Sequence, residues 1–412
     1  MHDRRLVRRK AVVWACHCAA WMALAAPRAA WADGAQPNDD ADLARLLDVE
    51  VEGASRYAQS TLDAPAVVRV FQHSDASLLG HETVGDLLQR LPGVYLTTNR
   101  SYTSFGLRGF DRAGDYNSRT LMTIDGLRVN DAVFDQALPG YEFPIPADWV
   151  KRTELIYGPA ASVYGSNALL GVANFAMLDG ADAPGATVRA GAGSFGRVRA
   201  AASYGLADPS GLDLFVGVVG YRDRGEDLSF PELASAQAPD GVARGLDGTR
   251  YQALFAKLRA GPWRASFISH ERDKDIATGE FDTSFGAPGT HYIDAYRFSE
   301  LGWDGGWTGS LRPSARLALG SYRYLGHYRY DAGTPDDLTN IDDLSGRWLD
   351  GEAKLQWHGR TNHVVVAGLD WRRVYSARLL NRDLEPAATY LDRRVDNWRA
   401  GLYLQDLSLI HI

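Results

Sequence analysis

The sequence predicts an α+β domain followed by antiparallel β-strands of the kind that build a transmembrane β-barrel. The first half mixes one helix with short strands and many turns. After about residue 185 the chain changes to a period-two alternation of apolar and polar residues, which is typical of strands with two different faces. The connections between these alternating segments are alternately short and long, as they are in outer-membrane barrels.

Composition excludes several other classes of protein. The chain has 412 residues, a formal net charge of −7, 45% hydrophobic residues and 11% aromatic residues, which excludes a disordered chain. Beyond the N-terminus no apolar run is long enough for a polytopic helical membrane protein. An acidic chain also lacks the basic stripe of a nucleic-acid-binding protein, so we expect no nucleic-acid partner.

Residues 1–32 have the three parts of a secretory signal peptide. A basic stretch around Arg4 to Lys10 precedes an apolar core from Ala11 to Ala26, and Ala30-Trp31-Ala32 is a small-x-small cleavage site ending at Ala32. Both cysteines, Cys16 and Cys18, lie inside this segment. The exported chain is therefore expected to hold no disulfide and no thiol nucleophile.

Residues 33–64 are predicted to form a leader and residues 65–180 a compact α+β domain. In the leader, Val49-Glu50-Val51-Glu52-Gly53 alternates as a short strand. In the domain, Glu82 to Leu91 is predicted to be a helix whose apolar residues share one face and which Pro92-Gly93 ends. Leu121 to Ile124 is predicted to be a strand that enters the turn Asp125-Gly126.

Residues 185–412 contain about ten predicted strands. From Leu349 to Trp357, for example, alternate residues are apolar or glycine and the residues between them are charged or polar. The short connections are predicted near 205–211, 261–262, 309–313 and 359–362, and the long ones near 225–249, 273–295, 331–346 and 377–394. Aromatic residues at strand ends resemble an interfacial girdle: Trp263, Trp307, Tyr328, Tyr330, Trp357 and Trp371. A membrane barrel is favoured over a soluble sandwich, because the sandwich does not need this asymmetry.

Four segments in the first half resemble, in order, the plug domain of TonB-dependent outer-membrane receptors. They are Thr83 to Val94 with its Pro-Gly-Val end, Leu107-Arg108-Gly109-Phe110, Leu121 to Asp131 with its Asp-Gly turn, and Arg152 to Ala168 followed by Gly171-Val172-Ala173-Asn174. Each segment alone is weak, but four in this order, behind a signal peptide and ahead of barrel strands, are a specific match.

The resemblance implies a plug seated in a 22-stranded barrel that lies in outer-membrane lipid of a Gram-negative bacterium. It also implies a function, the uptake of a scarce ligand powered through TonB, a component of the inner-membrane energy-coupling complex. A ferric siderophore is the commonest ligand of the family, and haem, cobalamin, another metal complex or an oligosaccharide stays open. No bond-breaking by this chain is required, so neither enzyme activity nor a cofactor is expected.

Two features differ from the family pattern. No clear TonB box is present, and Val49, Glu50, Val51, Glu52 and Gly53 are the best candidate for the contact with TonB, with an edge strand of the plug as the equal alternative. Residues 185–412 also cannot supply 22 strands of roughly ten residues each. We therefore expect a fragment or a truncated product with about ten strands, and an adhesion protein that binds without transport is the second functional hypothesis.

Several side chains are candidates for the site. Arg100, Tyr102, Phe134 and Tyr141 lie in predicted apical loops, where a cation and aromatic rings suit an anionic aromatic chelate, although ordinary loop residues are an equal reading for each. By position, Arg108, Arg152 and Glu154 resemble the plug charges that face the barrel wall. Such arginines could pair with Asp350 and Glu352, and a plug held by wet ion pairs would be loosened easily by force.

Other motifs carry no chemistry. Gly191-x-Gly193-x-x-Gly196 matches a dinucleotide fingerprint, but a strand and not a helix follows it, so a hairpin turn is predicted. The acidic residues around Asp336 to Asp343 lack the spacing of a calcium site. A pair of loop histidines could ligate haem iron, but no motif marks one. No metal site is therefore predicted.

Overall fold

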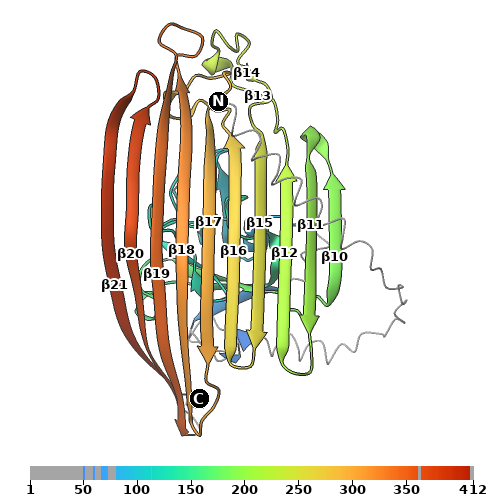
Figure 1. Cartoon of the computed structure of the whole chain (residues 1–412), viewed down its shortest axis with the longest axis vertical. Helices are drawn as coiled ribbons and strands as arrows, with labels where there is room; N and C mark the ends of the chain where they lie inside the picture. The colour runs from blue at the N-terminus through green and yellow to red at the C-terminus, as the bar shows by residue number, and fades with distance from the viewer. Residues whose placement is uncertain are drawn as a thin grey trace, which may run out of the picture.

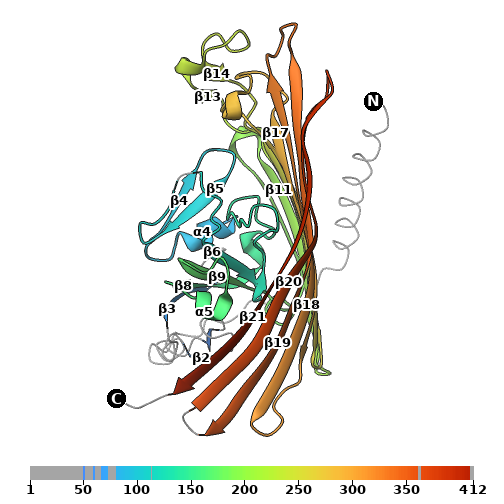
Figure 2. The same ribbon diagram turned by 90° about the vertical axis from the view of Figure 1, so that its left-hand side faces the viewer.

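The computed structural model describes residues 50–51, 59–60, 66–72, 80–112, 114–360 and 363–408. Two parts make up the fold (Figures 1 and 2). The described residues between 66 and 184, which we call the plug, lie against the concave face of a ten-stranded antiparallel sheet, which we call the wall. The predicted signal peptide with its cleavage site at Ala32 lies outside the described residues.

The plug is built on a five-stranded sheet in the order β3-β8-β9-β6-β7. Its strands are β3 (Val67–Gln72), β6 (Thr120–Ile124), β7 (Leu127–Arg128), β8 (Val150–Tyr157) and β9 (Gly171–Met177). The β6–β9 pair is parallel and the other pairs are antiparallel. Around this sheet lie the hairpin of β4 (Val94–Thr98) and β5 (Thr103–Leu107), the helices α4 (Val84–Leu88) and α5 (Ala161–Tyr164), and the single turn η2 (Ala147–Trp149).

Helix α4 is shorter than the sequence pattern predicted. Thr83 is its N-cap: the Thr83 hydroxyl accepts from the Asp86 N–H, and the Asp86 carboxylate accepts from the Thr83 N–H. The capping box fixes the start one residue after Thr83, and the helix ends at Leu88, before Pro92. In the described part of the chain, no helix is long and apolar enough to cross a membrane.

The wall follows chain order, with each strand antiparallel to the next. Its strands are β10 (Gly185–Ala192), β11 (Val198–Ala207), β12 (Leu212–Arg222), β15 (Thr249–Ala260), β16 (Trp263–Asp275), β17 (His291–Asp304), β18 (Leu311–Tyr330), β19 (Leu338–Arg360), β20 (His363–Asp383) and β21 (Ala388–Ser408). The glycines at 191, 193 and 196 lie in and around the β10–β11 hairpin connection, which confirms the predicted turn.

The wall has a turn end and a loop end. The turn end carries the connections 208–211, 261–262 and 305–310, and the loop end carries 193–197, 223–248, 276–290, 331–337 and 384–387. Within the long 223–248 connection, β13 (Leu228–Ser229) pairs with β14 (Val242–Ala243), and η4 (Pro231–Leu233) lies between them. The connection 276–290 holds the turn η5 (Glu280–Asp282).

Some predicted strand boundaries were wrong. Pro313 lies inside β18, opposite Leu355, and β19 begins at Leu338 rather than after residue 346. The region 377–394 is not a long loop, because β20 and β21 continue through it to the connection 384–387. Charged residues there pair across the strands, as Arg378 does with Asp392 at 2.9 Å, so their charge did not indicate a loop.

The two faces of the wall differ as the alternation predicted. Its outer face exposes large apolar side chains, including Leu301, Leu317, Leu319, Leu355, Leu402 and Leu404. Trp263, Trp307 and Trp357 are exposed near the turn end, as a girdle requires. The prediction that Tyr328 belongs to the girdle is wrong, because Tyr328 is 6% exposed and points inward with Tyr324 and Tyr292.

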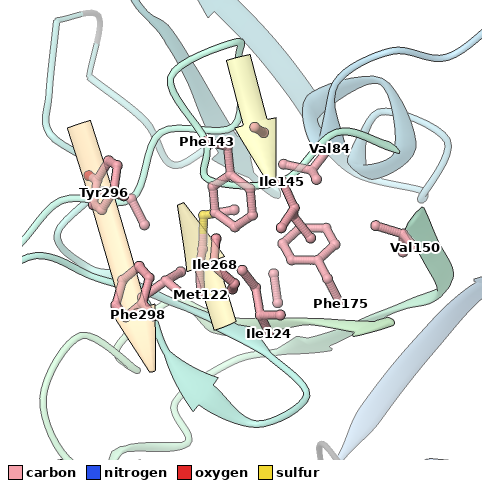
Figure 3. Close-up of a cluster of buried hydrophobic side chains, with 14 of the residues drawn as sticks. Val84, Met122, Ile124, Phe143, Ile145, Val150, Phe175, Ile268, Tyr296 and Phe298 are labelled. Carbon is pink, nitrogen blue, oxygen red and sulfur yellow. The ribbon is translucent and has the colours of Figure 1, made fainter. Parts of the chain in front are cut away.

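One apolar cluster joins the plug to the wall. Met122, Ile124 and Phe143 of the plug belong to the same buried cluster as Tyr296 and Phe298 of β17 (Figure 3). These side chains are at most 4% exposed. The expectation that solvated ion pairs hold the plug is therefore wrong in the middle of the interface, where the contact is apolar and buried.

Candidate functional site: the plug–wall interface

The plug meets the wall at an apical network near the loop end, at the central apolar cluster and at basal charge pairs near the turn end. Each level joins residues that are far apart in the sequence. The apical network holds the predicted ligand residues, so it is described first.

Arg100 lies at the tip of the β4–β5 hairpin. Asn99 Oδ1 accepts from the backbone N–H groups of Ser101 and Tyr102 at 3.1 and 2.8 Å, and Arg100 takes a positive φ of 76° inside this turn. The turn directs Arg100 Nη2 to Asp247 Oδ2, 2.6 Å away in the 223–248 connection. The Arg100 side chain is 36% exposed and also lies 3.4 Å from Glu226.

Tyr102 belongs to a buried network centred on Arg272 of β16. Arg272 lies over the Tyr102 ring at 5.0 Å, and its Nη1 is 3.3 Å from Glu142 of the plug and 3.4 Å from Asp294 of β17. Tyr102 also donates to Asp294 at 3.2 Å. Burial raises the pKa of Glu142, and the Arg272 charge opposes this rise. The guanidinium thus compensates two carboxylates that would be costly to bury alone.

Phe134 lies in a loop that Asp131 shapes. The Asp131 carboxylate accepts from the N–H groups of Val133 and Phe134 at 2.6 and 2.7 Å. The Phe134 ring stacks on Tyr116 with centroids 5.1 Å apart and meets Tyr324 of β18 edge to face at 6.0 Å. This loop therefore contacts the aromatic inner face of the wall.

Tyr141 contacts two other strands of the wall, at residues in register with Arg272. Its ring stacks on Tyr221 of β12 at 4.7 Å and on Tyr251 of β15 at 5.3 Å, and its hydroxyl donates to Glu82 at 2.7 Å. His270 Nε2 of β16 lies 2.9 Å from the Tyr141 carbonyl oxygen. The structure therefore brings all four predicted ligand residues to the interface with the wall or its loops, and their contact with a ligand stays a prediction.

The predicted charge set of Arg108, Arg152 and Glu154 has different partners from those expected. Arg152 Nε is 2.6 Å from Glu154 Oε1, two residues along the same strand β8, and the Glu154 side chain is fully buried. Arg108 lies over the Tyr157 ring of the plug at 4.7 Å.

The wall acids that were expected to meet these arginines have other partners. Asp350 forms a two-bond pair with Arg372 of β20 at 2.6 and 2.8 Å, and Glu352 pairs with Arg316 of β18. The sequence pattern identified charges in the right part of the fold but did not pair them.

Further ion pairs that cross the interface, from Lys257 near the turn end to Arg197 at the loop end, have acids on the plug and bases on the wall. Lys257 Nζ of β15 lies 2.9 Å from Asp125 and 2.8 Å from Asp179, and the Lys257 side chain is 7% exposed. Asp148 of η2 pairs with Arg189 of β10 and with Arg199 of β11, and Glu82 pairs with Arg197. Sequence reasoning missed these pairs because 41 to 132 residues separate the partners.

The candidate TonB segment is described in part. Glu50–Val51 form β1, which pairs antiparallel with β2 (Gln59–Ser60), so that Val51 lies opposite Gln59. Val49, Glu52 and Gly53 lie outside the described residues.

Two features that the sequence left without a role have structural explanations. In the acidic stretch, Asp337 pairs with Arg329 at 2.6 Å and Asp343 pairs with Arg323 at 2.9 Å. The rings of His291 and His327 stack with centroids 4.4 Å apart. Among the residues that the structure describes, no group of three or more His, Cys, Asp or Glu side chains could hold a metal ion.

Comparison with known proteins identifies both parts of the fold. Residues 60–172 match the TonB-dependent receptor plug domain family. The structure is similar to the ferric citrate transporter FecA, with a TM-score of 0.65 at 15% identity over 84% of this chain and 54% of FecA. The ferric yersiniabactin uptake receptor FyuA from Yersinia pestis gives 0.53 at 16% identity over 84% of this chain and 62% of FyuA.

A third similar structure is the ferripyoverdine receptor of the outer membrane of Pseudomonas aeruginosa. It gives a TM-score of 0.59 at 12% identity over 87% of this chain and 51% of that receptor. The chain thus spans between half and two thirds of the length of these three proteins. Residues 60–172 thus match the plug domain of TonB-dependent receptors, and the plug together with the ten-stranded antiparallel wall has the fold of these three similar structures.

Proposed function

We propose that this chain belongs to an outer-membrane receptor that takes up a ferric siderophore with energy supplied through TonB. The observation that carries the proposal is the position of the plug, which covers the concave face of the wall and is attached to it at three levels. A plug attached in this way blocks the lumen, so a ligand can pass only when the plug rearranges. The similar structures support the ligand class, because their names describe ferric citrate transport, ferric yersiniabactin uptake and ferripyoverdine reception.

We place ligand contact at the apical side of the plug, at Arg100, Tyr102, Phe134 and Tyr141. Arg100 has the most freedom to meet a ligand, since its guanidinium is partly exposed beside two loop carboxylates. An anionic chelate that attracts this guanidinium would compete with Asp247 for it. Such competition would couple ligand arrival to the loop 223–248.

We place the TonB contact at Val49 to Gly53. A short extended segment can add as a strand to the sheet of a partner, because its backbone N–H and C=O groups can pair with the partner's edge. In this chain, Val51 is opposite Gln59 in the β1–β2 pair. A TonB strand would take the place of β2.

The test uses iron-starved cells that express the receptor carrying this chain, as wild type, as Val51→Pro and as the matched control Val51→Ile. Surface binding and uptake are measured separately with ⁵⁵Fe as ferric citrate, a catecholate, a hydroxamate or haem, and with ⁵⁷Co-labelled cobalamin, haem and cobalamin being the non-siderophore ligands. Proline removes a backbone donor and cannot form a regular strand pair. We expect Val51→Pro to bind ligand but to lose uptake, while Val51→Ile keeps both and cells without TonB resemble Val51→Pro.

Other outcomes would contradict parts of the proposal. Binding without uptake in the wild type would favour an adhesion or binding protein over a transporter. Uptake of haem or cobalamin in place of the iron chelates would replace the ligand class and leave the coupling in place. Uptake by Val51→Pro at the wild-type rate would place the TonB contact elsewhere.

A further inference from the structure

A cavity of about 890 Å³ lies between the plug and the wall near the turn end. On the plug side it is lined by the β6–β7 turn with Asp125 and Gly126, and on the wall side by residues of β11, β12 and β15 to β21. Its volume is in the range of sites for small molecules. The cavity is separate from the apical network, because Arg100, Tyr102, Phe134 and Tyr141 are not among its lining residues.

Inward-facing charges form a belt on the wall of this cavity. In one row across the strands, Arg264 of β16 is in register with Gly302, and Gly302 is in register with Arg316 of β18. The residue between the two arginines is a glycine, and a Cβ there would be in ordinary contact with the Arg264 guanidinium, at 3.5 Å.

The next row brings two more arginines together. Arg372 of β20 is directly opposite Arg399 of β21. With Arg259 of β15, arginines therefore line the cavity from five strands of the wall, β15, β16, β18, β20 and β21.

At least four of the seven acids that line the cavity have partners in the wall or the plug. Arg372 donates two hydrogen bonds to Asp350, Arg316 forms an ion pair with Glu352, and Lys257 forms one with Asp125. Asp213 accepts from the backbone N–H groups of residues 180 and 181 at 2.7 and 3.0 Å. These carboxylates are thus engaged and are poor ligands for a cation.

Two of the arginines nevertheless keep an unused donor, although Arg264 Nη2 also pairs with Glu300 at 2.6 Å. Arg264 Nε and Arg399 Nη2 are buried and have no hydrogen-bond acceptor in the structure. The acid nearest to Arg399 is Asp135, at 3.9 Å, which is beyond hydrogen-bond distance. A buried donor without an acceptor costs free energy, and oxygen atoms of an anion would recover it.

We propose that this cavity is a transit site for an anionic, oxygen-rich metal chelate on the turn-end side of the plug. The proposal deepens the proposed uptake function and rests on it. Arginine suits this role, because its planar guanidinium binds carboxylate-type oxygens through two parallel bonds. Arg316 Nη1 is 3.3 Å from the carbonyl oxygen of Asp125, so a ligand that takes over this arginine would also loosen the β6–β7 turn.

Charge-selective thiol labelling tests the site in purified protein. Ser314 of β18 lines the cavity, and Ser310, an exposed residue just before β18, does not. Each is changed to cysteine in turn, Ser314→Cys for the cavity and Ser310→Cys as the control, with Cys16 and Cys18 absent or replaced by serine. The rates of reaction with an anionic and with a cationic methanethiosulfonate reagent of similar size are then compared, with and without citrate.

We expect the anionic reagent to be preferred at position 314 by about tenfold more than at position 310, the lower end of charge focusing in clefts. Citrate should slow the reaction at 314 and not at 310. Arg264→Gln with Arg316→Gln should abolish the preference, and Arg264→Lys with Arg316→Lys, which keeps both charges, should retain it. Equal preference at 314 and 310, a cationic preference at 314, or no protection by citrate would overturn the proposal.

This experiment separates the two proposals. It uses no cells, no TonB and no transport, so an anion preference in a protein that fails to take up any chelate would keep the cavity site and reject the uptake function. Uptake with equal labelling at 314 and 310 would keep the function and reject the cavity as the transit site.

Discussion

Asp131 is fully buried, and backbone N–H groups surround its carboxylate. It accepts from Val133, from Phe134 and, at 3.3 Å, from Gln136. Burial raises the pKa of Asp131 to about 7, although these donors act in the opposite direction. The carboxyl group therefore shapes the apical loop, and burial disfavours its ionised form at neutral pH.

The raised pKa gives a pH dependence with a definite sign. The unfolded aspartate titrates near 3.8, so between about pH 4 and 7 the folded protein holds more protons than the unfolded protein, and stability falls as the pH rises through this window. One pKa unit corresponds to about 1.4 kcal/mol, so the fall amounts to a few kcal/mol. We expect Asp131→Asn to remove this slope.

The measurement is urea unfolding of the purified protein from pH 4 to pH 8, followed by tryptophan fluorescence. The difference in unfolding free energy between wild type and Asp131→Asn isolates this group from other titrating residues. A difference that does not change with pH would show that the Asp131 carboxyl titrates normally.

Residue roles could be predicted from the sequence only where the partner is near in the chain. Thr83 and Asp86 are three residues apart, and their capping motif is readable. Arg272 and Glu142 are 130 residues apart, so their pairing needs the three-dimensional arrangement of wall and plug. Arg152 and Glu154 were identified as charged candidates, but their mutual pair depends on side-chain rotamers that a sequence does not show.

At the scale of elements, strand β12 fits the plug through one glycine. Gly217 faces inward, and a Cβ added there would lie 2.6 Å from the indole ring of Trp149. Trp149 is 2% exposed and ends the turn η2 just before β8. The absence of a side chain at position 217 thus lets this part of the plug approach the wall closely.

We expect Gly217→Ala to displace Trp149 and to weaken attachment of the plug, with a loss of about 1–3 kcal/mol, as in other overpacked cores. Gly220→Ala is the matched control, because it lies on the same strand and its Cβ would meet no atom within 4 Å. Limited proteolysis of the plug in detergent-purified protein gives the readout. Equal protection of the two variants would show that the contact of Trp149 with β12 is not needed for attachment.

The elements themselves were largely predictable. The period-two alternation gave the ten wall strands, and the strand after Gly196 correctly indicated a hairpin at the glycine motif. The boundaries of β20 and β21 were not predictable, because their charged residues form cross-strand pairs and their register shifts near Val374 and Asn381 interrupt the alternation. The sequence shows the two-residue period of a strand. It does not show where the strand ends when charged residues extend it beyond the alternating apolar part.

At the scale of the whole molecule, plug and wall share a core. The cluster that contains Phe143 of the plug continues to Ile268 of β16 and Phe298 of β17 (Figure 3). Alternation showed which wall residues face inward, but it could not show that the plug fills that side with apolar contacts. A plug attached through such a core and through buried pairs such as Lys257 with Asp125 resists small perturbations, so its rearrangement requires work from outside.

This shared core predicts that salt does not release the plug, whereas loss of one aromatic ring weakens its attachment. Salt screens exposed charges such as Arg189 and Arg197 strongly but leaves apolar contacts intact. We expect 1 M sodium chloride to leave protease protection of the plug nearly unchanged.

We expect Phe298→Ala, at a position 1% exposed, to lower the unfolding free energy by about 3–5 kcal/mol and to speed plug cleavage. Phe267→Ala, at a site on the outer face that is 37% exposed, is the control and should cleave like the wild type. Release of the plug by salt alone, with Phe298→Ala unaffected, would mean that charges and not the apolar core attach the plug to the wall.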